Sequence, residues 1–270
     1  MILVNGAARA EIPATDRGLA YGDGVFRTLR VREGTPQHWE RHYTKLARDC
    51  EALGLPCVGA SVLEHEVMAA REGSDCTIKV IITRGAAQRG YAYACDTPAM
   101  RVVIGAPWRE YPHAYQETGI TARLCSLRLA HQPALAGVKH LNRLENVLAR
   151  AEWHEPDIAE GILCDAEDNV ICGTMTNLFL AKNGTLVTPR LDRCGVAGVT
   201  RDRVVEAAAR LNYACEIRNI GWAEALAADE IFLVNSLAGL WPVRALDGKV
   251  WPAGPMTRAL QNALERDDGA

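Results

Sequence analysis

Lysine is scarce in this chain, which narrows the search for a side chain that could form an imine with a carbonyl group. Lysine and arginine together number 30 in the 270 residues, and only five of them are lysines. Lys139 stands out because it follows the small apolar run Leu135-Ala136-Gly137-Val138 and directly precedes a predicted helix. Apolar surroundings that desolvate an amine lower its pKa, as imine chemistry requires. The alternative is an ordinary lysine at the start of a helix.

The other four lysines fit less specialised roles. Lys182 and Lys249 lie in turn sequences, where solvent surrounds the ammonium group. Lys79 lies in the middle of a predicted strand, which favours a surface role, and Lys45 lies on the second turn of a predicted amphipathic helix. Lys139 is therefore the candidate for covalent chemistry.

A glycine-containing loop before a helix suggests a second kind of chemistry. The segment Gly195-Val196-Ala197-Gly198-Val199-Thr200-Arg201 leads into a predicted helix, with Thr200 placed to cap it. Exposed backbone N–H groups and the positive end of a helix dipole can bind a phosphate group. The alternative is a plain turn, since many helices follow such loops.

Two arginine-containing segments could recognise carboxylates. Thr83-Arg84-Gly85 and Arg89-Gly90-Tyr91 place two guanidinium groups near the end of a predicted strand, where each could bind a carboxylate through two parallel hydrogen bonds. The alternative is a pair of ordinary surface arginines. The stretch from Asp16 to Phe26 is also dense in glycine and charge, which indicates tight backbone turns.

The elements that would position these residues follow from the hydrophobic pattern. Apolar residues recur at helical spacing over residues 39–53, and a capping-box pattern, Ser61 with Glu64 three residues on, opens a second helix over 61–71. β-Branched runs at 77–83 and 101–106 predict strands. Prolines at 107 and 112 indicate a linker. We therefore expect an N-terminal α+β domain at 1–106, a linker at 107–113 and a larger C-terminal domain at 114–270.

The second half of the chain reads as a sheet with helices packed on it. A strand is expected near residues 119–127 and a helix over 140–153. Three tight-turn sequences, at 165–169, 182–184 and 246–249, predict antiparallel strand pairs. Further helices are expected over 201–211 and 255–266.

Composition restricts the class of protein. Hydrophobic residues make up 49% of the chain and charged residues 23%, and the net charge is −3, so nothing favours binding to nucleic acid or to an anionic membrane. The nine cysteines show no zinc-site spacing and are typical of a reducing compartment; they are at positions 50, 57, 76, 95, 125, 164, 172, 194 and 215. No signal-peptide pattern and no membrane-spanning run is evident. We therefore expect a cytoplasmic protein without a bound metal.

Taken together, these segments resemble the class-IV aminotransferase family, whose members are fold-type IV enzymes that use pyridoxal 5'-phosphate (PLP). Asp16 to Phe26 resembles the family's signature of aspartate, arginine and closely spaced glycines, and Asn177-Leu178-Phe179 and Gly198-Val199-Thr200-Arg201 resemble its Asn-Leu-Phe strand and its phosphate loop. Residues 139–145 and 83–91 are similar to those of the aminodeoxychorismate lyase branch. The resemblance implies an α+β fold of two domains: a small α/β N-terminal domain and a larger, β-barrel-like C-terminal domain with helices.

The resemblance also implies an activity, the conversion of 4-amino-4-deoxychorismate to pyruvate and 4-aminobenzoate, a folate precursor. Lys139 would carry PLP as a Schiff base and act as general acid and base. Family members are dimers, so a homodimer is expected. The other implied cofactor-binding residues are Lys45, Cys172, Asn177, Gly198, Val199, Thr200, Asn235 and Ser236, and the implied substrate-binding residues are Arg84, Arg89 and Asn142.

Two positions depart from the family pattern. Lys45 stands where the family usually has an arginine that contacts the PLP phosphate, so a compact ammonium would replace a bidentate guanidinium. Cys172, five residues before Asn177, stands where the family normally has a glutamate that keeps the pyridine nitrogen protonated. The nearest acid in the sequence is Asp168. This second departure weakens the expected electron sink.

Two other functions stay open at this point. An aminotransferase of the same family would need a strongly protonated pyridine, which Cys172 disfavours. A PLP-binding protein without catalysis would fit the two altered cofactor contacts. The retention of Lys139, of the phosphate loop and of both arginines argues against it.

Overall fold

The computed structural model describes residues 1–94 and 96–268 and divides into two compact units, with Cys95 outside the described residues. The first unit comprises Met1–Glu110 and Val138–Asn142, and the second comprises Tyr111–Gly137 and Arg143–Ala270. Val138–Asn142 therefore belongs to the first unit, whereas the sequence predicted it in the second domain at 114–270. Its backbone pairs with the first unit, because the Phe26 N–H donates to the Lys139 carbonyl oxygen (3.0 Å).

The first unit is built on a six-stranded antiparallel sheet with the strand order β2-β1-β6-β5-β3-β4. Along β3, Val25, Leu29 and Val31 are buried, whereas Phe26 and Thr28 are only partly buried. This period of two gives the sheet one apolar face and one more open face. The strands are β1 (Ile2–Val4), β2 (Ala7–Ala8), β3 (Gly24–Arg32), β4 (Thr35–Pro36), β5 (Cys76–Thr83) and β6 (Met100–Pro107).

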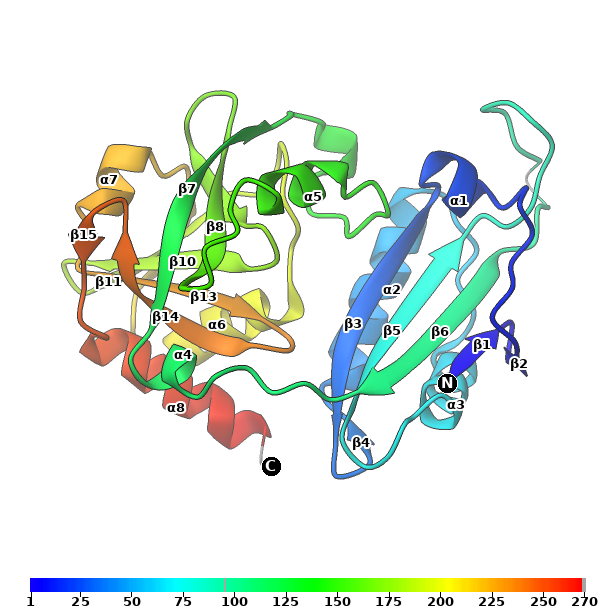
Figure 1. Ribbon diagram of the computed structural model, residues 1–270, viewed down its shortest axis with the longest axis horizontal. Helices are drawn as coiled ribbons and strands as arrows, with labels where there is room; N and C mark the ends of the chain where they lie inside the picture. Colours follow the sequence, from blue (N-terminus) through cyan, green and yellow to red (C-terminus); the bar gives the residue numbers. More distant parts are fainter. Residues whose placement is uncertain (95, 269–270) are drawn as a thin grey trace. The chain divides into compact units, whose positions relative to one another are not determined.

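Two helices cover the apolar face of this sheet and lie behind it in Figure 1. They are α2 (Trp39–Ala52) and α3 (Ala60–Ala69), and Leu46 and Leu63 bury their side chains in the same core as Ile78. No helix in the described part of the first unit covers the opposite face of the sheet (Figure 1). Side chains of that open face are therefore available to contact other groups.

Helix caps in the first unit differ in part from those expected. The capping box predicted at Ser61 was wrong, because the N-cap of α3 is Gly59 and no side chain caps the helix. The short helix α1 (Arg17–Tyr21) does have a side-chain cap: the Asp16 carboxylate accepts a hydrogen bond from the Leu19 N–H (3.2 Å). The charged, glycine-rich stretch predicted to turn tightly therefore contains a capped helix of one turn.

The second unit contains a closed ring of six strands in the order β10-β13-β14-β7-β8-β9, so the predicted barrel-like domain is confirmed. The pairing of Asn177 with Cys172 closes the ring between β10 and β9. β7 runs parallel to both β8 and β14, and the other neighbours in the ring are antiparallel. The strands are β7 (Ile120–Leu129), β8 (Ile158–Asp165), β9 (Val170–Gly173), β10 (Asn177–Lys182), β13 (Glu230–Asn235) and β14 (Gly239–Leu246), with β11 (Thr185–Pro189), β12 (Cys215–Arg218) and β15 (Lys249–Val250) attached to them.

The three predicted hairpin turns are confirmed. They join β8 to β9, β10 to β11 and β14 to β15, and each of these pairs is antiparallel. Asp168, Asn183 and Asp247 adopt φ angles of 59°, 51° and 50°, the left-handed region that Asn and Asp tolerate.

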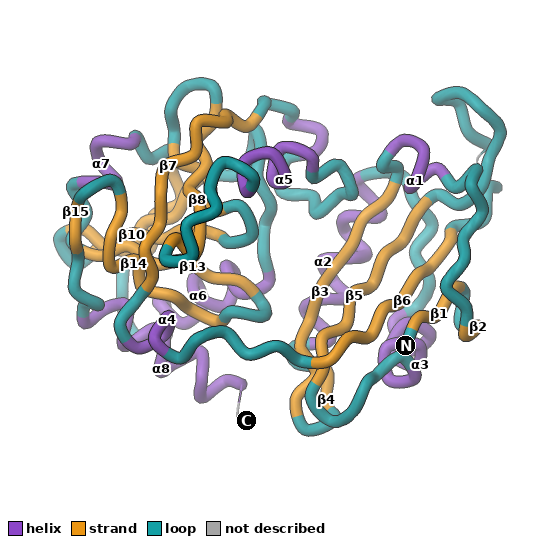
Figure 2. Tube along the Cα trace, viewed as in Figure 1, coloured by secondary structure: helices purple, strands orange, loops and turns teal. Residues whose placement is uncertain are grey.

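The helices of the second unit are α4 (Ala114–Glu117), α5 (Leu144–Arg150), α6 (Val199–Arg210), α7 (Trp222–Leu226) and α8 (Pro255–Asp268), with a 3₁₀ turn at Pro133–Leu135. Helices α6 and α8 lie together against the barrel strands β13 and β14 (Figures 1 and 2). The helix expected over 140–153 is shorter, because His140 pairs with Val25 of β3 and the helix begins only at Leu144. Within residues 1–94 and 96–268, no helix combines the length and apolarity needed to cross a membrane.

Candidate functional site

The N-terminus of α6 forms a cradle for an anion in the second unit. Gly198 is the N-cap, with an extended backbone (φ −73°, ψ 155°), and no side chain caps the helix. The cap expected from Thr200 was therefore wrong. The N–H groups of Val199 and Thr200 belong to the first turn, which a helix leaves without intrahelical partners. Together with the positive end of the helix dipole, they suit a phosphate.

Asn177 holds this cradle in shape. Its Nδ2 donates to the Val196 carbonyl oxygen (2.8 Å), and its Oδ1 accepts from the Gly198 N–H (3.2 Å). A Cβ added at Gly198 would lie 2.3 Å from that Oδ1, so only glycine fits the contact. The Asn177 side chain, predicted to bind cofactor, is thus engaged with the loop that would bind it.

Two hydroxyl groups meet beside the same helix end. The Thr200 Oγ1 and the Ser236 Oγ lie 3.4 Å apart, and Thr200 is buried. Asn235 shapes the turn that carries Ser236, because its Oδ1 accepts from the N–H groups of Leu237 (2.9 Å) and Ala238 (2.7 Å). Of the predicted residues, Thr200 and Ser236 therefore present hydroxyls at the cradle, and Asn235 supports them.

Gly137 is bonded to the segment that leads into this cradle. Its N–H donates to the Gly195 carbonyl oxygen (3.0 Å), and its own carbonyl oxygen accepts from the Ala197 N–H (3.0 Å). Lys139 follows Gly137 by two residues in the chain. The sequence therefore connects the candidate lysine to the cradle through a very short segment.

Lys139 is fixed through its backbone within the first unit. Its N–H donates to the Asp49 Oδ2 (3.1 Å), and its carbonyl oxygen accepts from the Phe26 N–H (3.0 Å). The side chain is half-buried, and its Nζ lies 4.6 Å from the centroid of the Phe26 ring. A defined backbone and an aromatic neighbour suit a lysine that forms a covalent link.

Asp49 connects Lys139 with Arg27 and Lys45. The buried carboxylate of Asp49 forms an ion pair with the buried guanidinium of Arg27. Burial raises the pKa of Asp49, against the opposing charges of Arg27 and Lys45. The Arg27 guanidinium also reaches the Lys45 carbonyl oxygen (3.4 Å). Lys45 lies one helical turn before Asp49 in α2, and the Asp49 carboxylate holds the Lys139 backbone.

Arg84, predicted to bind a substrate carboxylate, is largely engaged within the protein. Its three nitrogens donate to Asp23 (2.8 Å) and to the carbonyl oxygens of Gly54 (2.8 Å) and Leu53 (2.7 Å) at the end of α2. Burial would raise the pKa of Asp23, but its hydrogen bonds to Arg84 and Arg17 outweigh this and lower that pKa. Arg84 therefore stabilises the first unit, and only its remaining N–H groups are available to a ligand.

The other two predicted substrate residues are exposed. Arg89 lies in the loop after β5. The Asn142 Nδ2 donates to the Gly22 carbonyl oxygen (3.1 Å), which ties Asn142 to the end of α1. Both side chains are accessible to a ligand in solution.

Cys172 is buried at the junction of β9 and β10. It packs among Cys125, Trp153 and Cys194, and burial raises the pKa of its thiol well above the usual value. A neutral thiol in these surroundings is a weak partner for a pyridine nitrogen. Eight cysteines in the described part of the chain are free thiols.

Glu160 is a buried acid that the sequence analysis missed. Its carboxylate accepts hydrogen bonds from the Gly161 N–H (2.9 Å), from both the N–H and the hydroxyl of Thr174, from the Met175 N–H (3.2 Å) and from the Thr176 hydroxyl (3.0 Å). Burial raises its pKa, and these bonds oppose that effect. Glu160 therefore fixes the loop that follows Cys172, and its charge reaches that thiol. Its only sequence signal was an acid inside a predicted sheet region.

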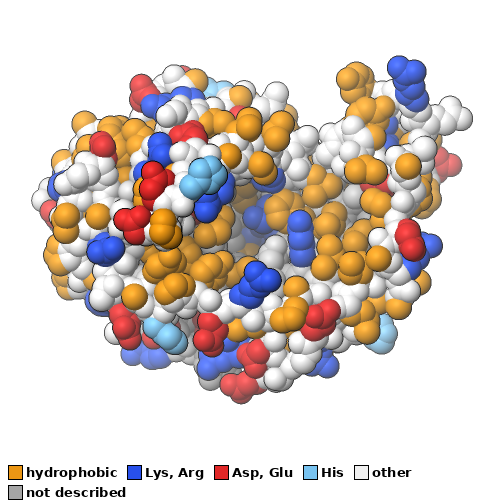
Figure 3. All heavy atoms as spheres, viewed as in Figure 1, with side chains coloured by type: hydrophobic (Ala, Val, Ile, Leu, Met, Phe, Trp, Pro, Cys, Tyr) orange, Lys and Arg blue, Asp and Glu red, His pale blue; other side chains and the backbone are white. Residues whose placement is uncertain are grey.

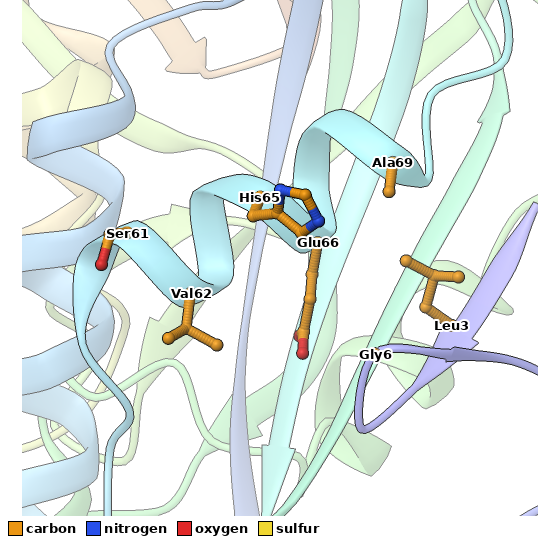
Figure 4. Close-up of a pocket in the computed structure, with 7 residues that line it drawn as sticks. All are labelled: Leu3, Gly6, Ser61, Val62, His65, Glu66 and Ala69. Atoms are coloured by element: carbon orange, nitrogen blue, oxygen red, sulfur yellow. The ribbon is translucent and has the colours of Figure 1, made fainter.

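A hollow on the first unit lies elsewhere. It is lined by Leu3, Gly6, Ser61, Val62, His65, Glu66 and Ala69, from β1, the turn after it and α3 (Figure 4). Glu66 is paired with Arg101 (2.7 Å), so its charge is already neutralised. None of the predicted site residues lines this hollow.

The first unit holds the candidate amine of Lys139, and the second unit holds a helix end suited to an anion and a six-stranded barrel. Among residues 1–94 and 96–268, no group of three or more His, Cys, Asp and Glu side chains is placed to hold a metal ion. The chain belongs to the amino-transferase class IV family, whose model matches residues 24–246. The resemblance inferred from the motifs is thereby confirmed.

Two individual relatives are aminodeoxychorismate lyases, and a third is an aminotransferase. The chain is 34% identical to an aminodeoxychorismate lyase of Vibrio harveyi, over 98% of this chain and 99% of that protein. The crystal structure of 4-amino-4-deoxychorismate lyase from Pseudomonas aeruginosa is 46% identical and superposes with a TM-score of 0.95, covering 99% of both chains. The crystal structure of the branched-chain amino acid aminotransferase of Escherichia coli is 25% identical with a TM-score of 0.86, covering 98% of this chain and 93% of that one.

Proposed function

We propose that this chain binds PLP, with Lys139 as its covalent anchor and the N-terminus of α6 as its phosphate site. The donor set fits the cofactor: Gly198 brings backbone N–H groups to the helix end without a side chain, and the hydroxyls of Thr200 and Ser236 lie beside them. The half-buried amine of Lys139 suits the aldehyde. Lys45 is assigned to the phosphate as well, as an ammonium in place of the family's arginine.

PLP, when bound, supplies an electron sink for bond cleavage next to a substrate amine. The residues of the chain supply orientation and proton transfer. The Asp49 carboxylate holds the Lys139 backbone, and the Phe26 ring lies beside the Lys139 Nζ. This support limits the positions that the amine can take, which is how a general acid or base is kept within reach of its proton.

The reaction that we propose is the conversion of 4-amino-4-deoxychorismate to 4-aminobenzoate and pyruvate. The similarity to two aminodeoxychorismate lyases over nearly the whole chain carries this proposal. The Lys139 Nζ takes the proton from the amine-bearing ring carbon. The bond from the ring to the enolpyruvyl oxygen then breaks, pyruvate leaves with a proton, and the ring becomes aromatic.

Arg84, Arg89 and Asn142 are the residues proposed from the sequence to contact the substrate. Arg89 and Asn142 are exposed, which is compatible with that role. Arg84 keeps N–H groups beyond those bonded to Asp23, Leu53 and Gly54, so a direct contact would have to use these.

Cys172 is proposed to face the pyridine nitrogen in place of the family's glutamate. A buried neutral thiol leaves this nitrogen less protonated than a carboxylate would. An aminotransferase depends more on that protonation than a lyase whose product is aromatic. Cys172 therefore favours the lyase over the aminotransferase, which is the second candidate because of the aminotransferase relative.

We also propose that the protein is a cytoplasmic homodimer. Leu144, Val147 and Leu148 are 68%, 61% and 53% exposed, and their spacing puts them on one face of α5. Apolar side chains gathered in this way are typical of protein interfaces. The second copy of the chain is the partner that we assign to this face.

The test is to incubate the PLP-loaded protein with 4-amino-4-deoxychorismate and, separately, with pairs of amino donor and keto acid. We expect 4-aminobenzoate and pyruvate in equal amounts from the first and little amino transfer in the second. Efficient amino transfer without 4-aminobenzoate would instead establish an aminotransferase. No turnover in either assay would favour a PLP-binding protein without catalysis.

A further inference from the structure

Lys79, which the sequence analysis assigned to the surface, lies beside the candidate catalytic lysine. The Lys79 Nζ is 4.8 Å from the centroid of the Phe26 ring, and the Lys139 Nζ is 4.6 Å from the same centroid. Both ammonium groups therefore occupy the region around one aromatic ring. All three residues belong to the first unit.

The strand register explains why Lys79 is there. Lys79 of β5 pairs with Thr28 of β3, and Phe26 pairs with Ile81. These side chains point to the face of the sheet opposite Leu29 and Ile78, which are buried under α2 and α3. Figure 3 shows this open face on the right, with apolar side chains and Lys or Arg side chains close together. Lys79 is thus a half-buried cation in an apolar setting.

The charge of Lys79 is not neutralised within the described part of the chain. Its ammonium takes part there in the contact with Phe26 and in no ion pair or hydrogen bond. Three buried arginines of the first unit are paired: Arg27 with Asp49, and Arg17 and Arg84 with Asp23. A half-buried ammonium without a carboxylate suits an anionic ligand.

We propose that Lys79 binds a carboxylate of the substrate. This inference rests on the proposed function, in which the substrate reacts at Lys139. The proposed substrate carries two carboxylates, one on the ring and one on the enolpyruvyl group. Arg84 donates to Asp23 and to two backbone carbonyls, so only part of its donor capacity remains for such a ligand. An ammonium on a flexible stem can reach one carboxylate as a point charge.

Steady-state kinetics of PLP-loaded variants test this role. We expect Lys79→Met to raise KM for 4-amino-4-deoxychorismate by at least about tenfold, the equivalent of roughly 1.4 kcal/mol, with a smaller effect on kcat. Lys79→Arg should recover most of the loss because it keeps the charge. Lys182→Met, which removes a lysine from the end of β10, should match the wild type. An unchanged KM in Lys79→Met, or a loss of PLP affinity alone, would overturn the proposal.

Chemical labelling provides a readout that does not depend on turnover. Lysines of the PLP-loaded wild-type protein are acylated, and the rate at Lys79 is measured by peptide mapping with and without 4-aminobenzoate or pyruvate. We expect one of these carboxylates to slow acylation of Lys79 and to leave that of Lys182 unchanged. An acylation rate at Lys79 that neither ligand changes would overturn the proposal. A wild-type protein that fails to form 4-aminobenzoate would overturn the proposed function, while the labelling would still report on Lys79.

Discussion

Replacing Gly198 by alanine tests whether the N-terminus of α6 holds a phosphate. The backbone of Gly198 (φ −73°, ψ 155°) suits alanine, so the effect of the change comes from the new methyl group. That group would lie 2.3 Å from the Asn177 Oδ1, closer than atoms can approach. We expect the Asn177 side chain to be displaced and to lose its bonds to Val196 and Gly198.

The size of the effect follows from those two hydrogen bonds. Each contributes about 0.5–1.5 kcal/mol, so their loss costs about 1–3 kcal/mol. If the loop must recover this free energy to become ordered when PLP binds, affinity for PLP decreases about 5- to 150-fold, because 1.4 kcal/mol corresponds to a factor of ten. The assay is a titration of cofactor-free protein with PLP, followed by absorbance and by tryptophan fluorescence.

Gly221 provides a matched control. It is the N-cap of α7, its backbone is nearly the same (φ −73°, ψ 154°), and an added Cβ would meet no atom within 4 Å. Gly221→Ala should therefore leave PLP affinity unchanged. Wild-type affinity in Gly198→Ala would refute the reasoning, because the cradle would then not depend on Asn177 or would not bind phosphate. Equal losses in both variants would indicate a general effect of alanine at helix caps.

Three further changes test other parts of the site. Lys45→Ala should weaken PLP affinity more than it slows the saturated enzyme, because a phosphate contact acts on ground-state binding; slower turnover with unchanged affinity would contradict this. Cys172→Glu should keep lyase turnover within about tenfold, roughly 1.4 kcal/mol, and raise conversion of bound PLP to pyridoxamine phosphate; loss of the lyase, or no rise in amino transfer, would place Cys172 away from the pyridine nitrogen. The pKa of Asp23 is below its usual value of 3.8, because its hydrogen bonds to Arg84 and Arg17 outweigh the effect of its burial. The ion pairs of Asp23 therefore stabilise the folded protein fully above the unfolded-state pKa, and this stabilisation is lost as the pH falls through the folded-state pKa. Asp23→Asn should therefore melt at a lower temperature than the wild type at neutral pH and approach it on acidification; a difference independent of pH would argue against this role.

Structural features that depend on residues close together in the sequence, such as turns and helix starts, could be predicted. Asn183-Gly184 and Asp247-Gly248 specify hairpin turns through their own backbone preferences, and the strands on either side pair as expected. The glycine before α6 marked the start of this helix, since a helix start depends on residues close in the sequence. The barrel followed from the family resemblance rather than from the strands alone.

Contacts between residues far apart in the sequence could not be predicted. The Glu160 carboxylate accepts hydrogen bonds from Thr174 and Thr176, and only the pairing of β8 with β9 brings these residues together. Arg84 donates to the end of α2, about thirty positions earlier in the chain, which its own sequence surroundings do not indicate. Lys79 alternates with buried residues of β5 as a surface lysine would, and only the register with β3 places it beside Phe26.

Lys139 is the residue on which the proposed PLP chemistry depends most. The direct measurement is to treat the PLP-loaded protein with sodium borohydride and to locate the reduced pyridoxyl group by peptide mapping. We predict that the imine absorbance band disappears, that the label is found on Lys139, and that Lys139→Ala shows neither band nor label. A label on Lys45 or Lys79 would contradict the central claim, because it would move the covalent chemistry to a different side chain.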